Sequence, residues 1–570
     1  MAIARPTAEQ LGALVDCARG RRPPDLLIHN ARVLRGYELQ FRLADIAVVD
    51  GRIALVHDEI EPGPATETLD AEGGAVVPGY IETHGHPHNV YNPLTLATPL
   101  ALGGVTTAVG DDFFLSQVLP LADMPAYYDA IACESAVRYR WSLRIEDADA
   151  LDRVAALVGR DDVAQLGEIP PWPELVAGDR TFLGMIADAL ALHKRADGHI
   201  PGASYTTVSA GGISADHEAI TPEEVLDRLA AGVRPILRHS SLRPDLPELV
   251  KGLLARPEGE IAWEQLLLTT DGSSAPFLLG GTMDRAISIL LDAGVPEGRA
   301  YSMATRNAAQ YEGEESEIGV VAPRRRADLC VLPDARTPTP RHVVRDGQLT
   351  VRDGRVVAES TFDLSTFPFR PIPAHLGRLT AKRIEAGYDR LPDPVPVIHL
   401  ESTAITRLHT VPKPRLTELR GTGLSLMLHH DRHRDALTVG LIDRFAADLP
   451  AMASTYGYSM GMLLAGTDVD SLVRTGARAA DLGGGIVWAA PDEHIEVPLS
   501  LGGVMSHLPF GDVAERLQRL ERAAAASGYP FHDVLYTLLF LAAGPLPDVR
   551  LLPEGIVSVK DRTVVVRADA

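Results

Sequence analysis

The stretch VVPGYIETHGHPH, residues 76–88, contains the pattern that decides the fold. An apolar, β-favouring run ends here in polar residues, which predicts a strand whose carboxyl end carries His84 and His86. Successive side chains of a strand point to opposite faces, so both imidazoles point the same way, with the small Gly85 between them. One strand end can therefore offer two nitrogens to one metal ion.

Four later segments follow the same plan, a short apolar strand that ends in a residue type found among metal ligands. They are VAQLGEIPP with Glu168, ADGHIPG with His199, GGISADHEAI with His217, and LLLTTDGSS with Asp271. Together with the first stretch they supply four imidazoles and two carboxylates, a set that suits a pair of divalent cations. A bridged pair can turn water into hydroxide at neutral pH. We therefore predict a metal-dependent hydrolase or deaminase.

Helical patterns alternate with these strands, over residues 173–196, 221–233 and 282–295. The second of them has a good start, because Thr221 can cap it, Pro222 suits the first helical position and Glu224 completes a capping box. Strands that alternate with helices imply a parallel α/β fold. In a (β/α)8 barrel the carboxyl ends of all strands open on one face, where six distant residues could converge. We predict such a TIM-like barrel over residues 79–318.

The motifs PGYIETHGH, LGE, DGH, DHE and TD, in this order, resemble the amidohydrolase superfamily. DGHIPG followed by ISADHEAITPEEVLDRLAAGV is similar to the adenine deaminase family, and LGGGIVW and PLSLGGVMSHLP resemble the C-terminal domain of that family. The resemblance covers the chain from about Asp25 to its end. It implies a binuclear centre of Mn, Fe or Zn with six ligands: His84, His86, Glu168, His199, His217 and Asp271.

Glu168 is the natural bridge between the two metals. Many members of the superfamily bridge their metals with a carboxylated lysine after the fourth strand. The predicted barrel contains only Lys194 and Lys251, and both lie in helical stretches rather than at strand ends.

The chain departs from the family pattern in residues expected near the substrate. Phe113 and Phe114 stand where the family has a His-Glu pair, and residues 457–461 (GYSMG) stand where it has HDSHN. Residues 238–241 (RHSS) replace the usual REGS. A site whose polar groups pair with the substrate discriminates strongly. The loss of these polar residues should therefore shift the preferred substrate away from free adenine.

The predicted reaction is hydrolytic deamination of an adenine-related or other amino-heterocycle, with release of ammonia or an amine. Asp271 would move the proton from the attacking hydroxide to the leaving nitrogen. Glu218 would orient a ring nitrogen, and His239 is a candidate proton shuttle or substrate contact. Two alternatives are a cyclic-amide hydrolase, similar to dihydropyrimidinases and hydantoinases, and a regulatory protein that kept the fold. Retention of the ligand set argues against the second.

Composition narrows the functional classes further. The 570 residues carry a formal net charge of −22, which argues against binding to nucleic acid. Three scattered cysteines fit a reducing cytosol rather than a disulfide framework. The N-terminus lacks the apolar core of a signal peptide, and no apolar run is long enough to span a bilayer. We expect a cytoplasmic enzyme with a small-molecule substrate, no membrane partner, and assembly as a homo-dimer or homo-tetramer.

Shifts in composition predict several domains. Strand and turn patterns before and after the barrel resemble each other, with Asp-Gly hairpin signals in both, so they are expected to pair as one small β-sandwich domain. A proline-rich linker and an adenine-deaminase-like α/β domain follow. The predicted boundaries are 1–23 for an N-terminal helix, 24–78 with 319–360 for the composite β domain, 79–318 for the barrel, 361–398 for the linker and 399–570 for the C-terminal domain.

Overall fold

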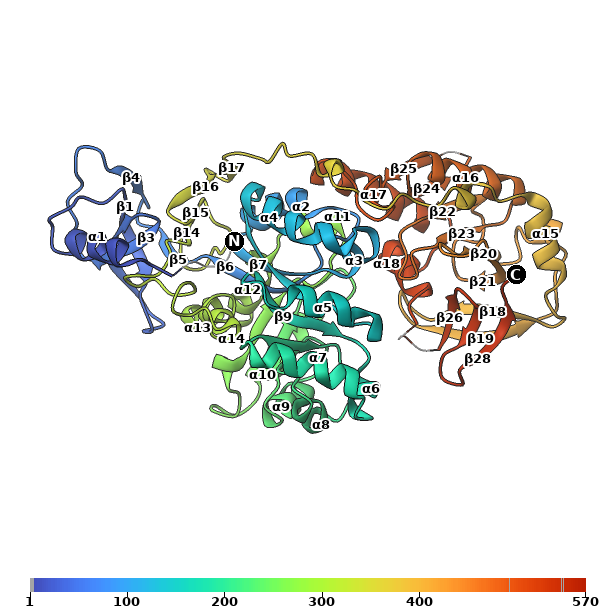
Figure 1. The fold of residues 1–570 in the computed structure, drawn as a ribbon, viewed down its shortest axis with the longest axis horizontal. Helices are drawn as coiled ribbons and strands as arrows, with labels where there is room; N and C mark the ends of the chain where they lie inside the picture. The colour runs from blue at the N-terminus through green and yellow to red at the C-terminus, as the bar shows by residue number, and fades with distance from the viewer. Residues whose placement is uncertain (1–4, 492, 545, 547, 570) are drawn as a thin grey trace.

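The computed structural model describes residues 5–491, 493–544, 546 and 548–569. Figure 1 shows three lobes in a row: a β lobe drawn mainly in blue, a central barrel, and a C-terminal lobe in orange and red. The central barrel carries the ligand-type residues, so its strand ends set the geometry of the site.

Eight parallel strands form the barrel within the described residues, and neighbours in the sheet follow chain order from β6 to β13. The sheet closes where Gly85 forms a parallel bridge with Asp271, just beyond β13. This confirms the predicted α/β barrel and brings the first and last strands of the series together. The strands are β6 (Tyr80–Gly85), β7 (Val105–Asp111), β8 (Arg138–Leu143), β9 (Val163–Ile169), β10 (Arg195–Gly198), β11 (Ala215–Asp216), β12 (Arg234–Arg238) and β13 (Leu267–Thr269).

Helices lie between successive strands and cover the outside of the barrel (Figure 1). The predicted start at Thr221 is confirmed, because its hydroxyl accepts from Glu224 N at 3.2 Å and the Glu224 carboxylate accepts from Thr221 N. The main covering helices are α2 (Pro93–Leu102), α4 (Met124–Glu134), α5 (Leu151–Leu157), α7 (Arg180–Ala191), α9 (Pro222–Ala230), α10 (Leu246–Leu254), α12 (Met283–Ala293) and α14 (Arg306–Glu312).

One predicted helix is shorter than expected. The pattern over 173–196 divides into α6 (Trp172–Val176) and α7. Gly178 has a φ of 81° in the left-handed region, which interrupts the helix, and Asp179 then caps α7 by accepting from Thr181 N at 2.8 Å.

The β lobe is built from two separate parts of the chain. Among the residues described, nine strands form one sheet: β1 to β5 come before the barrel, and β14 to β17 come after it. The two parts join where β5 pairs antiparallel with β14. The strands are β1 (Leu26–Leu34), β2 (Phe41–Val49), β3 (Arg52–His57), β4 (Glu67–Asp70), β5 (Ala75–Pro78), β14 (Leu329–Leu332), β15 (His342–Arg345), β16 (Gln348–Arg352) and β17 (Arg355–Val356), and α1 (Ala8–Ala18) precedes them.

The C-terminal lobe contains a second large sheet, with eight strands in the described part of the chain, in the order β19-β18-β21-β20-β23-β22-β24-β25. Its strands are β18 (Val395–Leu400), β19 (Thr406–Val411), β20 (Leu424–His430), β21 (Leu437–Asp443), β22 (Ala451–Ser454), β23 (Met462–Gly466), β24 (Gly485–Ala489) and β25 (His494–Pro498). The accompanying helices are α16 (Val469–Asp481), α17 (Phe510–Ala526) and α18 (Val534–Leu541), and a small sheet holds β26 (Val549–Leu552), β27 (Gly555–Ser558) and β28 (Thr563–Arg567).

A helix, α15 (Ala381–Asp389), lies inside residues 361–398, where the sequence predicts a proline-rich linker. Thr380 caps it, and its Ile384 and Tyr388 are buried against the C-terminal sheet. This packing explains why the segment is ordered despite its prolines.

No helix in the described parts of the chain is long and apolar enough to cross a membrane.

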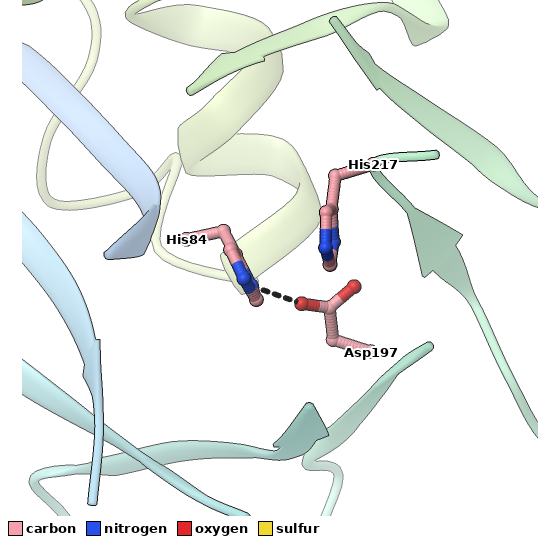
Figure 2. A group of neighbouring side chains, drawn as sticks. All are labelled: His84, Asp197 and His217. Carbon is pink, nitrogen blue, oxygen red and sulfur yellow. Dashed lines mark hydrogen bonds and ion pairs between the residues drawn. The ribbon is translucent and has the colours of Figure 1, made fainter. Parts of the chain in front are cut away.

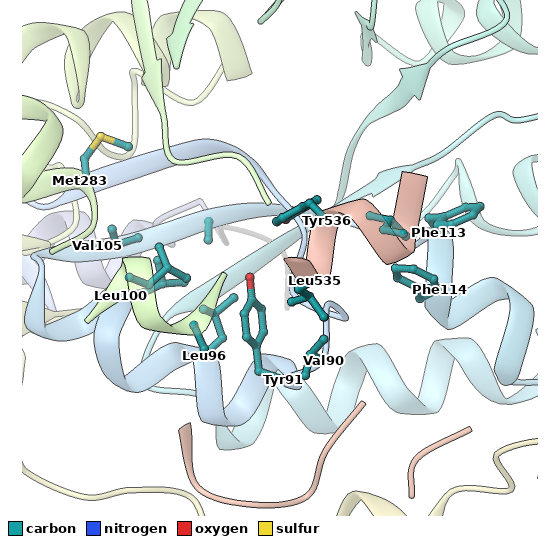
Figure 3. Packing of buried hydrophobic residues seen from close by; sticks show 14 of the residues in the cluster. Val90, Tyr91, Leu96, Leu100, Val105, Phe113, Phe114, Met283, Leu535 and Tyr536 are labelled. Carbon is teal, nitrogen blue, oxygen red and sulfur yellow. The ribbon is translucent and has the colours of Figure 1, made fainter. Parts of the chain in front are cut away.

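The C-terminal lobe packs against the barrel next to the HxH segment. Val90 pairs with Met505 in a parallel bridge, and Asn89 donates to the hydroxyl of Tyr536 at 2.8 Å. Figure 3 shows Tyr536 of α18 and Phe113 of the barrel, which belong to the same cluster of buried residues. Elements far apart in sequence thus meet over the carboxyl ends of the barrel strands.

A buried ion pair joins the barrel to the β lobe and generates a stability prediction. Arg138 of β8 donates to Asp328 at 2.7 Å and to Asp346 at 2.8 Å. Arg138→Ala would leave the buried Asp328 carboxylate without its cation, so we expect the free energy of unfolding to fall by about 3–5 kcal/mol in urea denaturation.

The matched control is Arg352→Ala, which removes the exposed pair with Glu67 at 2.9 Å. It should cost less than about 1 kcal/mol, because solvent screens an exposed pair. Equal losses in the two variants would contradict the structural role of Arg138.

Candidate metal centre

The first group of ligand-type residues forms where the barrel closes. His84 and His86 lie at the end of β6, and Asp271 follows β13. The Nε2 atom of His86 lies 2.9 Å from Asp271 Oδ1, and the Nε2 atom of His84 lies 3.7 Å from the same oxygen. The bridge between Gly85 and Asp271 accounts for this proximity.

The second group lies on the other side of the barrel mouth. His199 follows β10 and His217 follows β11, two parallel neighbours. His199 Nδ1 and His217 Nε2 are 3.3 Å apart. Two ring nitrogens therefore point at one small volume.

Glu168, at the end of β9, lies between these groups. Its Oε1 atom is 2.6 Å from His199 Nδ1 and 3.5 Å from His217 Nε2, while its Oε2 atom is 3.9 Å from His86 Nε2. Ligand-type atoms of Glu168, His199 and His217 all lie within 4.8 Å of one another, and so do those of His84, His86 and Glu168. Each oxygen of one carboxylate thus faces a different group, which is the arrangement that a bridging ligand needs. The structure brings all six predicted ligand residues together.

Glu82 anchors the first group. This buried carboxylate accepts from Thr270 N at 2.9 Å, from the Thr270 hydroxyl at 2.7 Å and from His84 N at 3.1 Å. It therefore ties the end of β6 to the end of β13 and fixes where His84 sits relative to Asp271.

Asp197 is a further member of the site that the sequence reasoning did not single out. Figure 2 shows its carboxylate between His84 and His217, and His84 Nδ1 lies 2.6 Å from Asp197 Oδ2. The signal was present, because Asp197 is the aspartate of the DGH motif that contains His199. Burial lowers the pKa of His84, but the Asp197 carboxylate outweighs burial and raises it.

The orientation of His84 suits metal binding. With its Nδ1 atom directed at Asp197, its Nε2 atom is left for another partner, and this arrangement is common for histidines that bind metals. His84 Nε2 is buried and has no hydrogen-bond partner among the described residues. A buried nitrogen without a partner is costly, and a divalent cation would satisfy it. The donor set of imidazoles and carboxylates thus fits a divalent metal.

Arg144 and Asp111 also contact the site. Arg144, just past β8, contacts Glu168 Oε2 and lies 3.0 Å from Asp111 Oδ2, and Asp111 Oδ1 lies 3.2 Å from His86 Nδ1. Burial raises the pKa of the Glu168 carboxyl, but Arg144 and then His199 hold it well below its usual range. Glu168 is therefore held as the carboxylate that a metal requires.

Arg238 likewise stabilises the ionised form of two other carboxylates of the site. It donates to Asp271 Oδ2 at 2.6 Å and lies 2.9 Å from Glu218 Oε1. Burial raises the pKa of Asp271, but Arg238 and His86 hold it well below its usual range. For Glu218, burial is likewise outweighed by Arg238, and its pKa is lowered to about 2. Both carboxylates are thus kept ionised.

His239 lies away from these contacts. Its ring packs against Phe277 at a centroid distance of 5.4 Å, and neither ring nitrogen has a hydrogen-bond partner among the described residues. Burial, together with Arg285, lowers its pKa to about 4, so the ring is neutral. No described contact joins it to the six-residue cluster, and its role as proton shuttle stays a prediction. Arg238, one residue earlier, faces the cluster instead.

Comparisons with known proteins find similarity along nearly the whole chain. A family model described as the adenine deaminase C-terminal domain matches residues 403–563. The chain is 32% identical to YerA of Bacillus subtilis, whose name marks it as a provisional adenine deaminase, over 98% of this chain and 97% of that protein. It is 30% identical to a protein of Nitratidesulfovibrio vulgaris named adenine deaminase, over 96% of this chain and 97% of that protein.

Among solved structures, the chain is similar to an enamidase described as a member of the amidohydrolase superfamily. The TM-score is 0.46 at 20% identity, and the match covers 59% of this chain and 98% of that one.

The position of Glu168 between the two groups generates a prediction about metal content. Glu168→Gln keeps the size of the side chain but removes its charge, so we expect the bound divalent metal per chain to fall by about half or more. Elemental analysis of the purified protein measures this directly. Glu515→Gln, on the exposed face of α17, is the matched control and should leave the metal content unchanged. Full metal content in Glu168→Gln would rule out Glu168 as the bridge.

Proposed function

The chain belongs to the adenine deaminase family, and from this premise we propose that it hydrolyses the exocyclic amino or alkylamino group of an adenine-related heterocycle. It is a hydrolase that acts on carbon–nitrogen bonds other than peptide bonds, and its substrate is a small molecule. Membership of the family implies a divalent metal centre. That the centre holds two ions, of Mn, Fe or Zn, is part of the proposal.

One observation carries this proposal: the two oxygens of Glu168 face two separate groups of ligand-type side chains. His84, His86 and Asp271 would hold one ion, and His199 and His217 the other. When bound, the ions would lower the pKa of water and so supply a nucleophile at neutral pH. The remaining work falls to side chains of this protein.

Asp271 is the group best placed to move the proton. It is ionised next to Arg238 and lies within 3.7 Å of both His84 and His86. An ionised carboxylate beside the attacked carbon can accept a proton from the nucleophile and return it to the leaving nitrogen. Arg238 steadies the charged form, so Asp271 begins the cycle as a base.

Glu218 is placed to orient the substrate. Its Oε1 atom lies 3.5 Å from His199 Nδ1, and Arg243 donates to its Oε2 atom at 2.9 Å. Because it is ionised, it can only accept hydrogen bonds, and a protonated ring nitrogen or an N–H of a heterocycle would satisfy it. This sets the side of the site on which the ring edge binds.

A panel of aminopurines, pteridines, aminopyrimidines and cyclic amides, incubated with metal-loaded protein, tests the reaction class. Release of ammonia or an amine with the ring intact supports a deaminase. Ring opening without amine release would overturn the proposal in favour of a cyclic-amide hydrolase.

The role of Asp271 gives a second prediction at the site. Asp271→Asn keeps the shape and part of the coordination but removes the proton acceptor, so kcat should fall by roughly 10²–10⁴ while part of the metal is retained. Steady-state kinetics and elemental analysis on the same sample separate the two effects. Asp292→Asn, on the exposed face of α12, is the control and should leave kcat unchanged. Near-normal turnover in Asp271→Asn would place the proton shuttle elsewhere, with His239 the next candidate.

The aromatic residues beside Arg144 generate a prediction about the substrate. Phe113 packs against Tyr458 at 4.7 Å, and the Arg144 guanidinium lies 5.0 Å from the Phe113 ring centre, beside Glu168. Phe114 packs against Tyr456 instead, and Met460 is buried. The wall beside the centre is therefore aromatic where the family pattern has a histidine.

The Phe113 ring offers no hydrogen-bond acceptor for the N–H groups of an unsubstituted amine, and each unsatisfied donor costs about 1–3 kcal/mol. We expect kcat/KM to be roughly 5- to 150-fold higher for N6-methyladenine than for adenine, since 1.4 kcal/mol corresponds to about tenfold. Phe113→His should shift the ratio towards adenine. A tenfold preference of the unaltered protein for adenine would contradict this proposal and restore adenine as the substrate.

A further inference from the structure

A chain of polar contacts runs from the C-terminal lobe to the metal centre. Tyr458 lies in the loop between β22 and β23, and its hydroxyl donates to Glu146 Oε2. The other oxygen of Glu146 accepts from Arg144 Nε, and Arg144 NH1 contacts Glu168. Three contacts therefore connect a tyrosine of one lobe with the carboxylate that faces both ligand groups in the other.

Among these contacting residues, Arg144 is the one whose orientation matters most. A guanidinium is planar and its donors form a rigid fork, so holding the Nε edge fixes where the NH1 group points. Glu146 holds the Nε edge, while NH1 reaches Glu168 and lies 3.0 Å from Asp111. A change in the position of Glu146 would therefore turn NH1 away from Glu168.

Packing reinforces this orientation. The Phe113 ring lies under the Arg144 guanidinium at 5.0 Å and beside the Tyr458 ring at 4.7 Å, with an interplanar angle of 34°. Arg144 is only 7% exposed and Phe113 is equally buried. The tyrosine ring thus has a packing role that is separate from the role of its hydroxyl, and the two can be tested apart.

The charges explain why the hydroxyl matters. Arg144 is one cation among three carboxylates, those of Asp111, Glu146 and Glu168. Mutual repulsion would move the most loosely held of them, and Glu146 is the most exposed, with 17% of its side chain accessible against 5% and 7% for the others. Burial and then Glu146 raise the pKa of Tyr458 well above its ordinary value, so the hydroxyl keeps its proton and donates.

We propose that Tyr458 is a positioning residue of the metal centre: through Glu146 and Arg144, the C-terminal lobe sets the direction of the Glu168 carboxylate. This deepens the proposed function and rests on it for the role of Glu168 as a metal bridge. The C-terminal lobe then contributes to catalysis through the orientation of the Glu168 carboxylate.

The test is Tyr458→Phe, which keeps the ring and its packing on Phe113 and removes only the hydroxyl. We expect the loaded protein to release divalent metal to a chelator about 10-fold faster, the lower end of the range for residues that support a metal ligand. This readout needs no substrate, so it stands or falls separately from the identity of the reaction. With a substrate that the protein turns over, kcat should fall while KM stays nearly constant. The substitution would change the position of Glu168 and not the contacts of the heterocycle.

A double-mutant cycle with Glu146→Gln separates a relay from two independent effects. If Tyr458 acts through Glu146, the double variant should release metal no faster than the worse single variant. Tyr456→Phe is the matched control, because this buried tyrosine packs on Phe114 and its hydroxyl has no hydrogen-bond partner among the described residues. It should behave like the unaltered protein.

Three results would overturn the proposal. One is metal release from Tyr458→Phe at the unaltered rate. Another is full additivity in the double variant. The last is a change confined to KM, which would make Tyr458 a direct contact of the substrate rather than a positioning residue.

Discussion

The carboxylate of Glu168 is the group on which the rest of the site depends. It is buried, and a buried charge is tolerated only when it is paired and hydrogen-bonded. Its two oxygens face histidines from β6 on one side and from the β10 and β11 ends on the other, and Arg144 supplies the compensating positive charge. These partners come from strands that meet only in a closed barrel. The closure of the barrel between Gly85 and Asp271 is therefore a requirement of the chemistry as well as of the fold.

The C-terminal lobe is part of this arrangement. It touches the barrel at the segment that follows the HxH pair, through Asn89 and Val90, and again at the loop that follows β8, through Glu146. Loops at the carboxyl ends of barrel strands are the segments that carry function, and here they are packed against a second lobe. Packing restricts their motion, so the orientation of side chains such as Arg144 is set before a substrate arrives. Preorganised charge of this kind is a large contribution to catalysis.

Much of the barrel could be predicted from the sequence, and so could the convergence of the six residues predicted as metal ligands, because each follows an apolar strand and the parallel fold aligns strand ends. The contacts of Arg144 and Arg238 could not be predicted. Arg144 meets Glu168 across 24 residues of chain and Arg238 meets Asp271 across 33, and an arginine at or just past a strand end carries no distinctive pattern. His239 was singled out for its residue type. Neighbouring side chains of a strand face opposite ways, and in β12 it is Arg238 that faces the cluster. The residue pattern of this short strand does not reveal which side faces the barrel mouth.

Two sets of residues next to the candidate metal centre differ in the groups that they can bind. On one side Glu218 is ionised and is held by Arg238 and Arg243, so it demands a hydrogen-bond donor. Beside Arg144, Phe113 and Tyr458 pack as aromatic rings. In the proposed reaction, a flat heterocycle would pair with Glu218 through its ring edge and would meet the apolar Phe113 ring near its exocyclic nitrogen. On the proposed function, replacing polar residues near Phe113 alone would change which amine substituents are accepted, because the residues proposed to carry out hydrolysis follow other strands. Divergence of substrate and retention of the metal centre are therefore compatible in one chain.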